Sequence, residues 1–181
     1  MMKRMLTYFA LAGLVVAPAY SQNRTTAPAK EAKTGEVIQL TPGLSAKVSK
    51  PSPSSFAAVK VKGEAVVIAI ELDAGQKGAM VFYKASADSK SEIYLTGASG
   101  RLLPHAVIED FPSMGSDNDK EVEVFDPKEG AGGGSVEFQG KGSISFLFDV
   151  PASQAHSPMK LTVTLRSIKP KPAEHSFVVN I

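Results

Sequence analysis

The sequence predicts an all-β protein, an antiparallel β-sandwich that follows an export signal and a polar linker. About ten to twelve short segments carry apolar residues at alternate positions, which is the side-chain period of a strand. Glycine, proline, serine and aspartate separate these segments, as expected for turns. Beyond residue 21, no segment repeats its apolar residues with the 3.6-residue period of a helix. Many short strands with turn signals between them favour two packed sheets.

The first 21 residues have the three parts of a secretory signal peptide. Lys3 and Arg4 supply the positive start, and residues 6–17 form an uncharged apolar run. Small residues then allow cleavage after Ala19 or after Ser21. The run has about a dozen residues, fewer than the roughly 20 that span a bilayer, although an uncleaved anchor or a core helix would use the same residues. We therefore expect a periplasmic or extracellular protein with no transmembrane segment in the mature chain.

Residues 22–35 are polar and show no periodicity, so we expect a disordered linker there. The predicted β-sandwich domain then covers residues 36–181. The chain has no cysteine, which excludes disulfide bonds and a lipid attached through a thiol. The fold must be stabilised by its core alone, and a domain of about 150 residues can bury enough surface to do this.

The charged residues are balanced overall but unevenly distributed. The net charge is +2, from 20 basic and 18 acidic residues, and removal of Lys3 and Arg4 with the signal leaves 18 of each. A balanced chain has no basic footprint for nucleic acid. Residues 105–150 carry a local charge of −7, whereas residues 22–104 carry +4 and residues 151–181 carry +3. The acidic region is either an interaction feature or a solvated surface.

The predicted strands follow one another along the chain and are separated by turn signals. Two prolines mark residues 50–55 as a loop. Gly63 indicates a bulge or a tight turn, and Pro104 indicates an edge position or a strand start, because proline has no N–H to donate. In order, the strand signals lie in residues 36–40, 44–48, 56–73, 79–84, 92–96, 101–109, 120–125, 136–139, 143–150, 160–167 and 175–181.

Two of these strands define the expected core. Between residues 66 and 72 both faces are apolar, which predicts a central strand that is covered on both sides. In the stretch "GSISFLFDVP", residues 142–151, the alternating set Ile144, Phe146, Phe148 and Val150 should face the opposing sheet. Leu147 is apolar on the other face, and we expect it to pack under the glycine-rich loop at residues 130–135 or at an interface.

Three stretches together resemble a known family. They are "GKGSISFLFDVPASQ…PMKLTVTL", "TGEVIQLTPGLSAKVSK" and "EAVVIAIELDAG". They look like the telokin-like, immunoglobulin-like domains of secreted bacterial proteins of unknown function. The chain departs from that pattern where "DAGQKG" replaces an Asn-rich turn. The resemblance implies an immunoglobulin-like sandwich and a life outside the cytoplasm, and it supplies no catalytic residues.

The candidate metal ligands are few. Asp117, Asp119, Glu121 and Glu123 alternate, so they would line one face of an extended chain and could offer oxygens to Ca²⁺. The EF-hand spacing is absent, and a solvated strand face explains the same residues. His156 and Met159 are suitable copper ligands, although a methionine before an apolar strand is more often core packing. Whether residues 117–123 bind a cation stays open.

Catalytic chemistry finds little support in the sequence. There is no cysteine nucleophile, and "GASG" at residues 97–100 lacks the glycine spacing of a nucleophile elbow. "GAGGGS" and "GKG" do not form a phosphate loop. His105, His156 and His175 are far apart, and Tyr83 and Tyr94 are the candidates for a carbohydrate platform. We expect no catalytic residues and no cofactor.

These observations predict a secreted or periplasmic, non-catalytic β-sandwich module. It would act through contacts with another protein or with an envelope component, in an oligomeric state that the sequence leaves open. The alternative is a periplasmic protein that binds calcium or copper, and a hydrolytic enzyme comes third. The metal content of the native protein would separate the first two.

Overall fold

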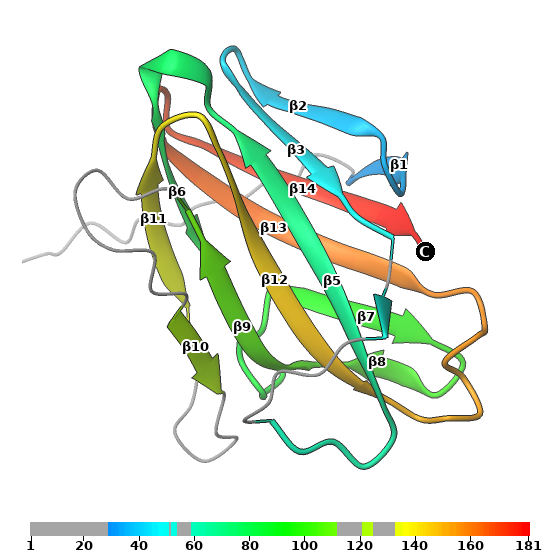
Figure 1. Ribbon diagram of the computed structural model, residues 1–181. Coiled ribbons are helices and arrows are strands. Elements are labelled where there is room, and N and C mark those ends of the chain that lie inside the picture. Colours follow the sequence, from blue (N-terminus) through cyan, green and yellow to red (C-terminus); the bar gives the residue numbers. More distant parts are fainter. Residues whose placement is uncertain (1–28, 51, 54–58, 112–120, 125–132) are drawn as a thin grey trace, which may run out of the picture.

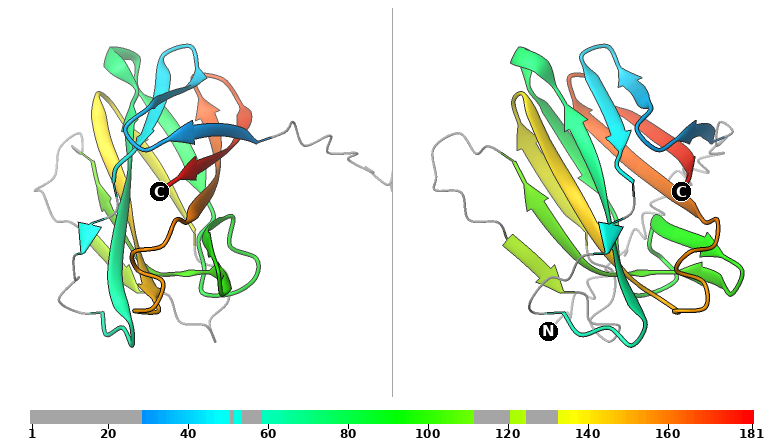
Figure 2. Two further views of the ribbon diagram at one scale, coloured as in Figure 1. Left: turned by 90° about the vertical axis from the view of Figure 1, so that its right-hand side faces the viewer. Right: turned by 45° about the vertical axis from the view of Figure 1, so that its right-hand side comes forward.

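The computed structural model describes residues 29–50, 52–53, 59–111, 121–124 and 133–181 (Figure 1). Within these ranges, fourteen strands and one short 3₁₀ turn at Gly75–Lys77 form two sheets of seven strands each. The sheets pack face to face over one main core, and Figure 2 shows the two layers from further sides. The predicted all-β sandwich is therefore confirmed.

One layer, sheet A, takes its strands from the beginning, the middle and the end of the described part of the chain. They are β1 (Lys30–Lys33), β6 (Ala79–Tyr83), β7 (Ile93–Gly97), β8 (Gly100–Leu102), β11 (Gly134–Phe138), β13 (Lys160–Lys169) and β14 (Ala173–Asn180). The hydrogen-bonded order is β1–β14–β13–β6–β11. β7 also pairs with β13, and β8 pairs with β7, so β13 connects the whole sheet. β1 runs parallel to β14, whereas the other pairs are antiparallel.

The second layer, sheet B, is antiparallel throughout. Its strands are β2 (Val37–Thr41), β3 (Leu44–Val48), β4 (Ser52–Pro53), β5 (Glu64–Asp73), β9 (Pro104–Asp110), β10 (Glu121–Val124) and β12 (Lys141–Val150). The order is β10–β9–β12–β5–β3–β2, and β4 lies beside β5. The two longest strands, β5 and β12, pair along their full length at the centre. This central pair provides the rigid platform of the sheet.

β12 has the inner face that its sequence predicts. Ile144, Phe146, Phe148 and Val150 have no exposed surface, and Pro151 follows the end of the strand. The ring of Phe146 meets the ring of Tyr83 edge to face, with centroids 5.7 Å apart. The residues of β13 and β14 in the same core are Leu161, Val163, Leu165, Phe177 and Val179. The core thus lies between β12 on one sheet and β13–β14 on the other.

Leu147 is also fully buried, on the outer side of β12. It packs with Val67 and Ala106 in a second, smaller cluster, and Val59, Val61 and Ala65 pack against it. The residues that pack against this cluster therefore lie just before β5 and at its start. This differs from the prediction that Leu147 packs under the glycine-rich loop at residues 130–135 or at an interface, because residues 59–65 of the same sheet side supply the apolar contacts. The same cluster confirms that β5 is covered on both faces, because Val67 lies opposite Ile68 and Ile70.

Asp149 fixes the chain that covers this second cluster. Its carboxylate accepts the backbone N–H groups of Lys62 at 3.0 Å and of Gly63 at 2.7 Å. A Cβ at Gly63 would come within 2.2 Å of the Val150 carbonyl oxygen, so a larger residue there would have to move the backbone. Gly63 lies in the bend before β5, which confirms the tight turn, and Pro104 begins β9 as predicted.

The first strand of the domain begins earlier in the chain than the sequence predicts. Residues 30–35 belong to the expected disordered linker, but Lys30–Lys33 form β1 beside β14. Ala32 is 3% exposed and joins the main core, which explains why this short strand is held. The domain therefore includes residue 30, and the linker prediction persists for residues 22–29. The predicted signal peptide, residues 1–21, lies outside the described residues.

Candidate functional site

The predicted calcium ligands lie mostly outside the described part of the chain. Asp117 and Asp119 fall outside it. Glu121 and Glu123 are in β10, where they pair with Glu109 and Val107 of β9. In the described ranges, no group of three His, Asp or Glu side chains is placed to hold a metal ion. Calcium binding by residues 117–123 stays a prediction.

The structure places the predicted copper ligands in different surroundings. His156 is exposed in the loop after β12, whereas Met159 is 4% exposed and belongs to the main core. A methionine in that position contributes packing. His105 is exposed on β9, and His175 is half-buried on β14, so the three histidines occupy separate elements.

One serine–histidine pair is brought together that the sequence does not single out. Ser167 Oγ lies 3.1 Å from His175 Nε2, beside the turn between β13 and β14. Ser167 Oγ also lies 2.6 Å from the Lys171 carbonyl oxygen, to which it must donate its one proton. Nε2 of His175 then donates to the serine, which is the opposite of a base that activates a nucleophile. Ser167 is 3% exposed, so this pair is a structural contact.

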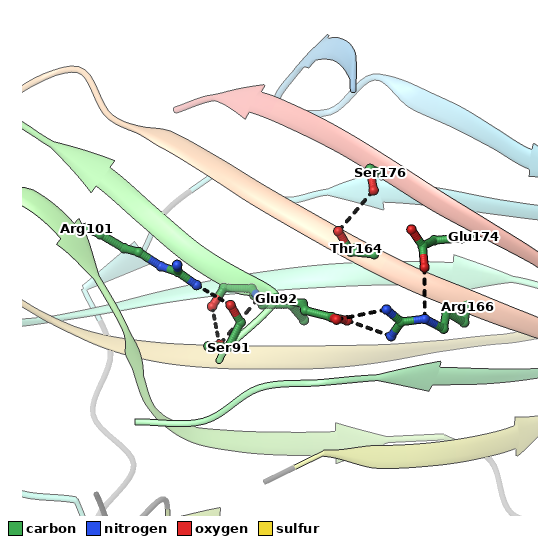
Figure 3. A network of polar contacts seen from close by, with 8 residues as sticks. Ser91, Glu92, Arg101, Thr164, Arg166, Glu174 and Ser176 are labelled. Carbon is green, nitrogen blue, oxygen red and sulfur yellow. Dashed lines mark hydrogen bonds and ion pairs between the residues drawn. The ribbon is translucent and has the colours of Figure 1, made fainter. Parts of the chain in front are cut away.

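A polar network crosses the outer face of sheet A (Figure 3). Arg166 donates two hydrogen bonds to the Glu92 carboxylate at 2.6 and 2.8 Å and one to Glu174 at 3.0 Å. Hydrogen bonding to Glu92 raises the pKa of Arg166 above its ordinary value, so the guanidinium stays charged. Thr164 and Ser176 share a hydrogen bond in the adjacent pair. The network joins β13, β14 and the residue before β7, and its charges are paired.

Neither candidate tyrosine offers an open platform for a sugar. Tyr83 is 1% exposed, and its hydroxyl donates to Glu109 at 2.6 Å, which links the two sheets. Tyr94 is half-buried on β7, and the Arg101 guanidinium carbon lies 3.7 Å from its ring centroid. Arg101 also donates to the Ser91 carbonyl oxygen. Because a cation already covers the ring of Tyr94, a stacked sugar would have to displace it.

The outer face of sheet B carries a hollow of about 540 Å³. Strand register builds it from two rows of outward side chains that run across the strands. One row runs Val37–Lys47–Glu71–Ser143–Asp110. The second row runs Ser45–Asp73–Lys141. Inward neighbours such as Ile70 and Ile144 are fully buried, so the rows stand on a packed sheet. We call this site the sheet B groove.

The sheet B groove offers both signs of charge at fixed positions. Lys47 lies 2.7 Å from Glu71, and Lys141 lies 3.8 Å from Asp73. Such exposed ion pairs contribute about 0–1 kcal/mol, so a ligand can replace them at little cost. Ser45 and Ser143 add hydroxyl groups, and Val37, which is 61% exposed, supplies an apolar rim. The volume lies within the roughly 300–1,000 Å³ typical of ligand sites.

Sequence reasoning misses this groove. The only trace of the groove in the sequence is the polar residues at alternate positions of β3, β5 and β12. These outward-facing residues are Ser45 and Lys47, Glu71 and Asp73, and Ser143. Each strand alone has the ordinary pattern of a solvated face. The pairing of β3, β5 and β12 brings these residues into one hollow, and register between strands far apart in the chain cannot be derived from one sequence.

Comparison of the sequence with known proteins gives no family. No family of protein sequences matches the chain, and no curated protein matches it either.

Comparison of the structure finds distant similarities. The secreted protein MPT63 of Mycobacterium tuberculosis is 14% identical, with a TM-score of 0.41, over 86% of this chain and 100% of that one. A family 123 glycoside hydrolase of Clostridium perfringens, which hydrolyses glycolipid glycans, is 8% identical with a TM-score of 0.32. That match covers 67% of this chain and 22% of the hydrolase, so the chain spans about a fifth of it. Similarity this distant assigns no function.

Proposed function

We propose that this chain is an exported, non-catalytic β-sandwich module of immunoglobulin-like type that binds a ligand in the sheet B groove. The observation that carries the proposal is the groove itself. It is a hollow of about 540 Å³ that paired strands line with hydroxyls, two lysines and three carboxylates. Sites on strands hold their side chains more firmly than sites on loops, because the sheet fixes their spacing.

Export is supported by the sequence of residues 1–21, with its positive start, apolar run and small residues. In the described ranges, no helix has the length and apolar character needed to cross a bilayer. We therefore assign the mature chain to the periplasm or the extracellular space. Its binding partner would be another protein or a component of the cell envelope.

The direction of the hydrogen bond between Ser167 and His175 supports a non-catalytic role. The serine proton is committed to the Lys171 carbonyl oxygen, and Nε2 carries a proton that points toward the serine. Neither group can start a nucleophilic attack in that arrangement. Among the described residues, the lining of the sheet B groove contains no histidine, and its two lysines form ion pairs with Glu71 and Asp73.

The chemistry of the groove favours a short, extended ligand that carries charges of both signs, such as a peptide. Its long row crosses five strands, a distance of about 19 Å at the usual strand spacing. An ammonium group could pair with Glu71 or Asp73, and a carboxylate could pair with Lys47 or Lys141. A ligand with one sign of charge would leave half of these groups without a new partner.

The test is a screen of tetrapeptides that differ in charge, measured by fluorescence anisotropy. Ser143→Arg should block the groove, because it places a long side chain on its floor, and should weaken binding at least tenfold. Ser135→Arg puts the same side chain on exposed β11 of sheet A and should leave affinity unchanged. Equal binding by wild type and Ser143→Arg would remove the groove as the site.

A further inference from the structure

The outer face of sheet A carries a row of exposed polar residues at one end. Register pairs Lys33 of β1 with Asn180 of β14, Asn180 with Lys160 of β13, Lys160 with Thr96 of β7, and Thr96 with Arg101 of β8. All five are exposed, and the neighbours of these residues along the strands, such as Ala32 and Leu161, are buried. We call Lys33, Lys160 and Arg101 with the two residues between them the cationic row.

The cations of this row occupy every second strand. Adjacent strands lie about 4.8 Å apart, so the backbone positions of successive cations are separated by about 10 Å and the row is about 19 Å long. The cations come from the two flanks of the chain that carry +4 and +3, and the acidic residues 105–150 contribute nothing to it. The uneven distribution of charge along the sequence thus produces a row of positive charges at one end of sheet A.

Two of these cations have no acidic partner among the residues that the structure describes. Lys160 lies 3.8 Å from Glu31, an exposed pair, while Lys33 and Arg101 make no ion pair in the described ranges. The Glu36 carboxylate is near, since it accepts the backbone N–H of Lys33 at 3.0 Å. Arg101 is held over Tyr94 and donates one nitrogen to Ser91, so its fork is oriented while most of its donors remain available.

Acidic residues elsewhere on sheet A decide between a linear and a planar partner. Glu31 occupies the next row, and Glu92, Glu174 and Glu137 lie farther along the same face. An anionic membrane pressed on this face would meet these carboxylates together with the cations. A single extended chain can follow the cationic row and avoid them. The arrangement therefore favours a linear anion.

We propose that the cationic row docks an acidic segment of a partner polypeptide, which lies across the strands of sheet A. In the polyproline II conformation, side chains three residues apart share one side and are about 9.3 Å apart, close to the spacing of the backbone positions that carry the cations. Carboxylates suit the planar fork of an oriented arginine. This surface lies on the opposite sheet from the groove, so its failure would not affect the proposed function.

The test measures fluorescence anisotropy of a labelled peptide with four Glu-Pro-Pro repeats at low salt. Lys33→Gln, Lys160→Gln and Arg101→Gln should each weaken binding about two- to fivefold, as expected for exposed ion pairs, and the triple variant at least tenfold. Arg101→Lys should lie between wild type and Arg101→Gln, because it keeps the charge and loses the fork. Lys169→Gln is the matched control, since Lys169 pairs with Glu137 outside the row. Binding should weaken as salt is raised.

Three outcomes would overturn the proposal. They are unchanged binding by the triple variant with its circular dichroism spectrum intact, equal weakening by Lys169→Gln, and equal binding of a Lys-Pro-Pro peptide. Binding to phosphatidylglycerol vesicles is measured in the same way. Binding to vesicles without binding to the acidic peptide would assign the row to a membrane surface and reject a polypeptide partner.

Discussion

At the scale of single residues, Leu147 shows how a position on the outer side of a strand can still be core. It has no exposed surface, because Val59, Val61 and Ala65 pack over the cluster that it forms with Val67 and Ala106. Ser145, two residues before it on the same face, is partly exposed. The outer side of β12 is therefore partly exposed at Ser145 and fully buried two residues later at Leu147.

Leu147→Ala should destabilise the protein by about 2–5 kcal/mol, in the range of Phe146→Ala and Phe148→Ala, because each change leaves a cavity in a packed cluster. Ser145→Ala should stay within about 0.5 kcal/mol, the usual range for surface sites. Urea unfolding of the four variants provides the measurement. A loss for Leu147→Ala as small as that for Ser145→Ala would show that its cover is not packed in solution.

His175 should make stability depend on pH. Burial lowers the pKa of His175 below its ordinary value of 6.5, so the folded state favours the neutral ring. Below about pH 6.5 the unfolded chain binds the proton more readily than the folded chain. Stability should therefore fall as the pH drops from about 6.5 to the folded pKa, and stay level for this group below that. The urea midpoint of His175→Gln should show a smaller decrease over this interval, and an unchanged decrease would contradict the assignment.

At the scale of elements, the segment before β5 covers the cluster around Leu147, and the carboxylate of Asp149 holds this segment in place. Asp149 on β12 accepts two backbone N–H groups from residues 62 and 63. The same strand thus supplies the apolar side chain to be covered, Leu147, and the polar group that fixes the cover. The stretch "LFDVP", residues 147–151, combines these two functions with the proline that terminates the strand.

Asp149→Ala should cost about 1–3 kcal/mol, because two backbone donors lose a charged acceptor. Hydrogen exchange at the amides of residues 62 and 63 should become faster, while the amides of the β12–β5 pair keep their protection. Asp149→Asn retains one carbonyl acceptor, so its stability and its amide exchange rates should lie between those of the wild type and those of Asp149→Ala. Unchanged exchange in Asp149→Ala would mean that packing alone holds the segment.

The elements also show what a single sequence can and cannot predict. The alternation in β12 and β13 correctly predicts their inner faces, because every second residue of a half-buried strand is apolar. β1 was not predictable in this way, since "KEAK" has a single buried side chain, Ala32, and its pairing joins residues 30–33 to residues 177–180, which are far away in the sequence. The cover over Leu147 depends on a similar long-range contact.

At the scale of the whole molecule, the fold presents two chemically different outer faces. Sheet B carries a groove with paired charges of both signs, and sheet A carries the cationic row at one end. The residue types of both sites are visible in the sequence. Their assembly needs strand order and register, so the sequence predicts a binding module without locating either surface.

Export is the other prediction at this scale. Leu14→Arg combined with Val15→Asp places two charges in the apolar run of residues 6–17 and should retain the protein in the cytoplasm. Cell fractionation with N-terminal sequencing of the secreted protein is the measurement. Unchanged secretion of the double variant, or a mature protein that begins at Met1, would contradict the signal peptide.

Mapping the bound ligand by NMR tests the central claim, that this sandwich binds through the sheet B groove, most directly. The backbone amide spectrum of the mature chain would be titrated with the tetrapeptide that binds best. The account predicts that the largest shift changes fall on Ser45, Lys47, Glu71, Asp73 and Ser143. It also predicts small changes at sheet A positions such as Thr164 and Ser176. Shift changes concentrated on sheet A, with the groove residues unaffected, would contradict the claim.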